Sequence, residues 1–262
     1  MNHLKPSISV NVDITNPGQY FACCGLLELA DRLWPGAEGW FDENDEHFHL
    51  KAEGSLAELI QSISTAELTP IRKADPYSTP IRLGAPFRPL GIDWWETDLT
   101  GARDLKVWAG TMESFGIAHA MQHALKEPRF WAALLFHEGM VVTVPGAPKK
   151  KKEPYYFDSR RAPNAHSRDV GFSVNDISIS SVAHPAVELL CLVGLQVARP
   201  RPAGKPRIYD YFAWHIPLPP NLLIPVTTGA IFHASSHLYR FENWFRTGQR
   251  KHKAFRSAVP IR

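Results

Sequence analysis

The stretch YFACCGLLELADRLW, residues 20–34, is apolar on nearly every side in its first half, which is typical of a buried helix. Residues 15–18, TNPG, precede it as a turn that supplies a cap residue and a proline at the helix start. Residues 185–198, PAVELLCLVGLQVA, predict a second buried helix that also begins with proline. Each helix follows a strand-like alternation, which would fit an internal βα repeat, and each carries one Gly-Leu pair, Gly25-Leu26 and Gly194-Leu195.

The remaining patterns predict an α+β fold of mixed strands and buried helices. Segments that alternate apolar and polar residues, or are rich in β-branched residues, indicate strands, and segments with one apolar face indicate short helices. Of the 22 prolines, 16 fall in three regions that we expect to be extended and irregular. Strands are expected at 7–14, 48–52, 140–144, 171–180, 208–216 and 222–226, helices at 56–63 and 111–125, a helix or loop at 229–247, and the proline-rich regions at 70–89, 145–163 and 200–225.

Charge divides the chain near residue 145. Residues 1–145 hold 11 basic and 19 acidic side chains, a net charge of −8, whereas residues 146–262 hold 18 basic and 7 acidic ones, a net charge of +11. A cationic half with interleaved aromatic residues suits a polyanionic partner. We therefore divide the chain into an acidic α+β half, 1–145, and a basic α+β half, 146–262, which are either two domains or parts of one continuous domain.

The basic half contains residues 149–172, KKKKEPYYFDSRRAPNAHSRDVGF. We expect its four lysines to lie in a loop flanked by glycine and proline, which would be disordered unless a partner neutralised its charge. Aromatic rings offer faces on which bases stack, and arginines offer the planar fork that holds phosphate oxygens. A second basic cluster lies near the C-terminus. The residues expected to contact nucleic acid are Lys149, Lys150, Lys151, Lys152, Tyr155, Tyr156, Arg160, Arg161, Arg168, Arg250, Lys251, Lys253 and Arg256.

The three cysteines, Cys23, Cys24 and Cys191, do not suggest a disulfide framework, because their number is odd and two are adjacent. The adjacent pair lies inside an apolar helix, so we expect small core residues rather than nucleophiles. No nucleophile elbow, P-loop or dinucleotide-binding motif is present. No stretch approaches the roughly 18–20 apolar residues of a membrane span, and the N-terminus lacks the apolar core of a signal peptide, so we expect a cytoplasmic protein without a membrane partner.

Two histidine pairs are spaced so that both members share one face of a predicted helix or strand. Such spacing is compatible with metal binding, but no HExxH motif or carboxylate at a fixed offset accompanies either pair, and we expect ordinary half-buried side chains. The sequence therefore predicts no catalytic residue, no metal and no cofactor. The pairs are His119 with His123, for which His137 or Glu138 would be the third ligand, and His47 with His49.

Four segments, in this order, resemble a small CRISPR-associated family of the type I-U loci, since renamed I-G. They are NPGQYFACCGLLELADRLW (16–34), LKVWAG (105–110), YYFDSRRAPNAHSRDVGFSVND (155–176) and HPAVELLCLVGL (184–195). TMESFG, which follows the second segment, and the lysine run depart from the family pattern. The resemblance covers most of the chain and implies a place in a CRISPR RNA-guided surveillance complex. It implies one of two roles. The chain would be either a RAMP-like subunit, whose ferredoxin-like βα halves contact the guide RNA, or a large-subunit-like protein that contacts the target duplex.

The expected function is thus that of a non-catalytic subunit in antiviral defence, which contacts guide RNA, target DNA or both and packs against other Cas subunits. One alternative is a RAMP-type endoribonuclease that processes guide RNA, with His166 beside the arginine pair as general base. The other is a protein–protein adaptor within the complex.

Overall fold

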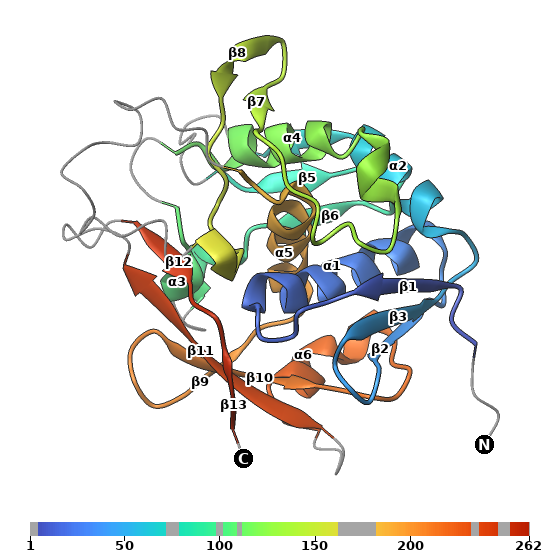
Figure 1. Cartoon of the computed structure of the whole chain (residues 1–262), viewed down its shortest axis with the longest axis vertical. Helices are drawn as coiled ribbons and strands as arrows, with labels where there is room; N and C mark the ends of the chain where they lie inside the picture. Colours follow the sequence, from blue (N-terminus) through green and yellow to red (C-terminus); the bar gives the residue numbers. More distant parts are fainter. Residues whose placement is uncertain are drawn as a thin grey trace.

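Two buried helices, α1 (Pro17–Leu33) and α5 (Pro185–Val197), cross at the centre of the computed structural model (Figure 1). Both begin at proline and are buried along most of their length, as their sequences predict. Small antiparallel sheets surround the helix pair, which confirms the α+β class. The structure describes residues 5–71, 79–97, 102–108, 112–161, 182–231, 236–245 and 252–261. The strand expected at 171–180 lies outside these ranges.

The N-terminal sheet contacts α1 and has the order β1-β3-β2 (Ile8–Asn11, His47–Lys51, Glu38–Phe41). Buried residues alternate along each strand, so one face of the sheet is apolar and covers the helix. Helix α2 (Leu56–Thr65) follows and begins with a capping box. This β-α-β-β-α order, with β3 between β1 and β2, is the connectivity that opens a ferredoxin-like unit. The next strand, β4 (Leu68–Pro70), does not complete the unit, because it joins a separate sheet.

The described residues between 68 and 131 form that second sheet, ordered β4-β5-β6, and the helices around it. Helix α4 contacts both α2 and α5. The side-chain amide of Gln122 on α4 donates to the backbone carbonyls of Ile63 and Ala66, at 2.9 and 2.8 Å, and so fixes the end of α2. The elements of this region are β5 (Ile81–Leu83), β6 (Leu90–Ile92), η1 (Trp94–Glu96), α3 (Ala102–Leu105), α4 (Ser114–Ala124) and η2 (Pro128–Trp131).

The C-terminal sheet has the order β12-β11-β10-β9, and β13 also pairs with β11. Two sequence predictions are wrong here. Residues 222–226 form η5 and α6 instead of a strand, with Leu223 and Val226 buried one helical turn apart. Residues 237–245 form strand β11, because their buried side chains recur at every second position. The elements are β9 (Arg201–Pro202), β10 (Ile208–Ala213), η5 (Pro220–Leu222), α6 (Leu223–Thr227), β11 (His237–Phe245), β12 (Lys253–Phe255) and β13 (Val259–Ile261).

One hydrophobic core draws on residues from both sides of position 145, so the division of charge is not a division of the core. The ring of Tyr20 on α1, for example, packs against that of Tyr211 on β10 with centroids 4.2 Å apart, and its hydroxyl donates to the backbone carbonyl of Phe212 at 2.6 Å. No helix in the described ranges is long and apolar enough to cross a membrane. The remaining elements are the hairpin of β7 (Thr143–Val144) and β8 (Ala147–Lys151), which protrudes at the top of Figure 1, and η3 (Ser159–Arg161).

Candidate nucleic-acid interface

The lysine run lies on the β7–β8 hairpin and not in the loop that the sequence predicts. Gly146 makes the turn with a φ of +78°, and Lys149, Lys150 and Lys151 are residues of β8. Alternation along the strand sends Lys149 and Lys151 to one face of the ribbon and Lys150 to the other, so like charges are spread apart. All three are exposed, and no carboxylate in the described part of the chain pairs with Lys149 or Lys150. The hairpin therefore carries an open cationic surface.

Lys152 differs from its three neighbours because it turns back towards α4. Its ammonium group lies against Gly116, and burial lowers its pKa, although the charge of Glu113 opposes that shift. A groove of about 330 Å³ between α4 and β7 is lined in part by His123 and by the exposed Lys126. Glu127 lines the same groove, so the groove adds no net positive charge near the base of the hairpin.

Tyr155 is fully buried, which corrects the expectation that its ring offers a face to a base. Its hydroxyl donates to a backbone carbonyl of α4, and its ring packs edge-on against Trp108 with centroids 4.9 Å apart. Tyr156 is half-buried, donates its hydroxyl to Glu153 at 2.7 Å, and has the guanidinium of Arg161 4.8 Å above its ring. Burial of the Tyr155 ring stabilises the core, because it removes a large apolar area from water.

Arg160 is committed to an ion pair with Asp158, whose side chain is fully buried. The guanidinium approaches both carboxylate oxygens, at 2.5 and 2.9 Å, and this pairing keeps the pKa of Asp158 below its usual value despite the opposing effect of burial. Asn16, the cap of α1, donates its amide to Asp158 at 2.9 Å and accepts from the backbone N–H of Ser159 at 3.1 Å. Two of the three guanidinium nitrogens of Arg160 are therefore already bonded within the protein, and its charge is matched by Asp158.

Glu188 holds the same segment from the first turn of α5. Its carboxyl group accepts from the backbone N–H groups of residues 156–158 at 3.0 to 3.2 Å, and burial, with the nearby charge of Asp158, raises its pKa to about 7. Burial lowers the pKa of His184 to about 4, although its ring lies 3.2 Å from the Asp158 carboxylate. Arg161 is buried as well. Residues 156–161, which we call the helix clamp, thus join the starts of α1 and α5.

The C-terminal basic cluster is also partly occupied by internal contacts. Lys253 of β12 donates to the backbone carbonyl of Asp104 at 2.7 Å, and burial lowers its pKa to about 8. Arg256 lies 4.1 Å above the ring of Trp244 and 3.4 Å from the carboxylate of Glu242. Three predicted contact residues lie outside the described ranges: Arg168, Arg250 and Lys251.

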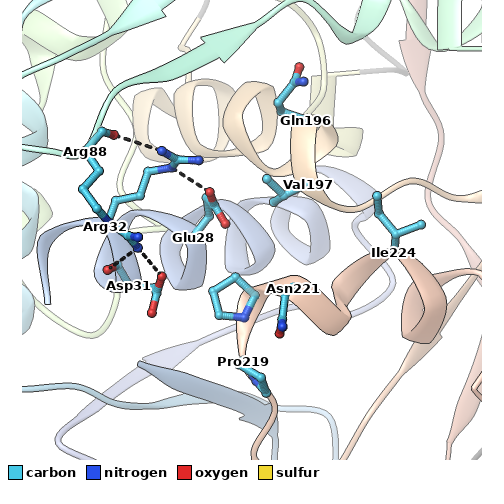
Figure 2. Close-up of a pocket in the computed structure, with 10 residues that line it drawn as sticks. Glu28, Asp31, Arg32, Arg88, Gln196, Val197, Pro219, Asn221 and Ile224 are labelled. Atoms are coloured by element: carbon cyan, nitrogen blue, oxygen red, sulfur yellow. Dashed lines mark hydrogen bonds and ion pairs between the residues drawn. The ribbon is translucent and has the colours of Figure 1, made fainter. Parts of the chain in front are cut away.

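A cavity of about 550 Å³ lies where α1 and α5 end, and Figure 2 shows the charged side chains at its edge. Arg32 lies 2.6 Å from the carboxylate of Glu28, and Arg88 lies 2.6 Å from that of Asp31. Arg32 also donates to the backbone carbonyl of Arg88 at 3.0 Å. Because both guanidinium groups are matched by carboxylates, this cavity does not extend the cationic surface.

The structure also brings together three side chains of types that can bind a metal ion, which no sequence pattern indicates: Asp45, His215 and His237. The two histidines lie 170 and 192 residues beyond Asp45 along the chain, and the three occupy different elements, so no spacing rule could have joined them. Within the described ranges this is the one such group, and neither predicted histidine pair acquires a third ligand.

Comparison of the chain with protein-family models, with curated proteins and with solved structures found no match.

Proposed function

We propose that this protein is a non-catalytic subunit of a type I (I-U/I-G) CRISPR RNA-guided complex, in which it holds a nucleic-acid backbone through the β7–β8 hairpin. The observation that carries the proposal is the placement of Lys149, Lys150 and Lys151, exposed on a ribbon that projects from the body. Lysines that neutralise phosphates release counterions, which gives affinity without sequence preference. Sequence would then be selected by base pairing with the guide, as in other guided systems.

The shape of the hairpin favours duplex DNA as its ligand. A two-stranded ribbon is one of the elements that the major groove of B-form DNA admits, and lysines on both faces of the ribbon would reach both phosphate walls. The major groove of A-form RNA is too narrow to admit side chains. We therefore propose duplex target DNA as the preferred ligand of the hairpin, and single-stranded parts of the guide RNA as the second candidate.

In this proposal, the acidic half of the chain contacts other protein subunits. Residues 1–145 carry a net charge of −8, which repels nucleic acid and suits contact with basic protein surfaces. Other Cas subunits would supply those surfaces, in a complex that acts in the cytoplasm in antiviral defence. The resemblance of four sequence segments to the CRISPR-associated family supports this placement.

Binding of the purified chain to a duplex DNA and to a single-stranded RNA, across a salt series, tests the proposal. We expect micromolar or tighter binding at low salt, a preference for the duplex, and an affinity that falls steeply as salt rises. The RNA should be recovered intact, and its cleavage would favour the endoribonuclease alternative. Absence of binding to either ligand at low salt would overturn the proposal and favour the adaptor.

A further inference from the structure

Asp45, His215 and His237 meet where the β2–β3 turn touches the ends of β10 and β11. The Asp45 carboxylate lies 2.8 Å from Nε2 of His215 through one oxygen and 2.6 Å from Nδ1 of His237 through the other. The two imidazole rings are 4.7 Å apart. The three ligand atoms all lie within 4.8 Å of one another.

The local structure holds Asp45 firmly towards the histidines. Its φ is +60°, an uncommon conformation for any residue with a side chain. Asp42 fixes the turn, since its carboxylate accepts from the backbone N–H groups of Glu46 and His47 at 2.8 and 3.1 Å. The Asp45 side chain is only 3 % exposed, its carboxylate contacts both histidine rings, and it accepts a hydrogen bond from the Tyr239 hydroxyl. It is thus a buried carboxylate held against both imidazole rings.

We propose that these three side chains bind a divalent transition-metal ion of the zinc class. Two imidazole nitrogens and one carboxylate oxygen suit Zn²⁺ better than Mg²⁺ or Ca²⁺, which prefer oxygen ligands only. Ligand distances of about 2.0–2.2 Å require the facing atoms to separate slightly, and each imidazole to carry its proton on its other nitrogen. Tyr239, which donates to Asp45 at 2.7 Å, would orient the carboxylate from outside the coordination sphere.

Exposure of the site leaves room for water as a further ligand. The side chain of His237 is 52 % exposed, whereas that of His215 is 7 % exposed, so the ion would reach the site from the His237 side. A bound ion would tie the β2–β3 turn to β10 and β11 across most of the chain. Because the ion would bind the folded protein and not the unfolded chain, its binding would stabilise the folded state.

Titration of tag-free protein with Zn²⁺ alone tests this site, with His237→Asn as the main variant. Asparagine can keep a donor towards Asp45 in place of Nδ1, and the exposed position should tolerate the change. We expect one Zn²⁺ per chain, a rise in the midpoint of thermal unfolding on its addition, and a loss of at least about tenfold in affinity in the variant. Co²⁺ should give a visible spectrum without thiolate charge transfer.

The double variant His119→Ala/His123→Ala removes the histidine pair of α4 and should bind Zn²⁺ like the wild type. Equal Zn²⁺ affinity of His237→Asn and the wild type would overturn the proposal, as would the absence of saturable binding. Mg²⁺ that binds as tightly as Zn²⁺ would overturn the zinc-class assignment. Circular dichroism of the metal-free variant separates loss of the site from loss of the fold.

Discussion

Gly25 of α1 and Gly194 of α5 face each other where the two central helices cross. A Cβ atom on Gly25 would overlap the carbonyl oxygen of Leu190 and lie 3.0 Å from the backbone nitrogen of Gly194. A Cβ atom on Gly194 would overlap the carbonyl oxygen of Phe21 in the same way. Both obstacles are backbone atoms, which cannot move aside as a flexible side chain does. The absence of two side chains is therefore what lets the helices approach so closely.

Gly25→Ala and Gly194→Ala should each destabilise the protein by at least about 3 kcal/mol, because the added methyl group forces the helices apart and disturbs the core around them. Urea unfolding followed by circular dichroism measures the loss. Gly91→Ala is the matched control, since a Cβ atom at Gly91 meets nothing within 4 Å. If all three variants were equally stable, the crossing would not depend on the glycines.

The central helix pair could be predicted from the sequence, because its apolar residues and proline starts are local signals. The Gly-Leu pairs are visible in both helices, but the contact between Gly25 and Gly194 depends on packing across about 170 residues. Helix α6 was not predicted, since its short apolar run fits several conformations, and strand β11 was not predicted although its buried positions alternate. The structure of these segments depends on packing between residues that are far apart in the sequence.

Arg160→Ala should act on stability and not on nucleic-acid binding. The change leaves the buried Asp158 carboxylate without its main counter-charge, which should cost about 3 kcal/mol. The salt dependence of nucleic-acid binding should stay as in the wild type, because the Arg160 charge is already matched inside the protein. Chemical unfolding and binding in a salt series provide the two measurements.

Arg129→Ala is the control for that change, because the pair of Arg129 and Glu127 is largely exposed and should contribute less than about 1 kcal/mol. A shallower salt dependence in Arg160→Ala, without loss of stability, would mean that Arg160 contacts phosphate directly.

The titration of Glu188 should make stability depend on pH. Its pKa is about 7 in the folded protein and 4.5 in the unfolded chain, so the folded state holds the proton more tightly. The resulting stability is complete below pH 4.5 and is lost as the pH rises through 7. Relative to Glu188→Gln, the wild type should lose roughly 3 kcal/mol over this range.

Urea unfolding of both proteins at several pH values measures that difference. His184 has the opposite effect between about pH 4 and 6.5, because its folded pKa is lowered, but it is present in both proteins and cancels. Parallel pH profiles for the wild type and Glu188→Gln would contradict the assignment.

The candidate interface could be predicted only in part, because residues 149–161 include both an exposed strand and a segment that packs against the core. Its composition makes the whole segment basic and aromatic, which predicts contact with nucleic acid. The exposed lysines of β8 remain candidates for such contact. Tyr155, Arg160 and Arg161 instead hold the core and the helix clamp, since each finds an aromatic or charged partner within the protein. Sequence alone does not show which cations have internal partners.

The most direct measurement compares duplex-DNA binding by three proteins in the same salt series: the wild type, Lys149→Ala/Lys150→Ala/Lys151→Ala, and Lys5→Ala/Lys51→Ala/Lys205→Ala. The third protein gives up equal charge from exposed lysines away from the hairpin. The slope of log affinity against log salt becomes shallower by about 0.9 for each phosphate that the protein no longer neutralises. We predict a change approaching three phosphates in the hairpin variant alone, with unchanged thermal stability. Equal slopes for the two triple variants would contradict a specific role for the β7–β8 hairpin.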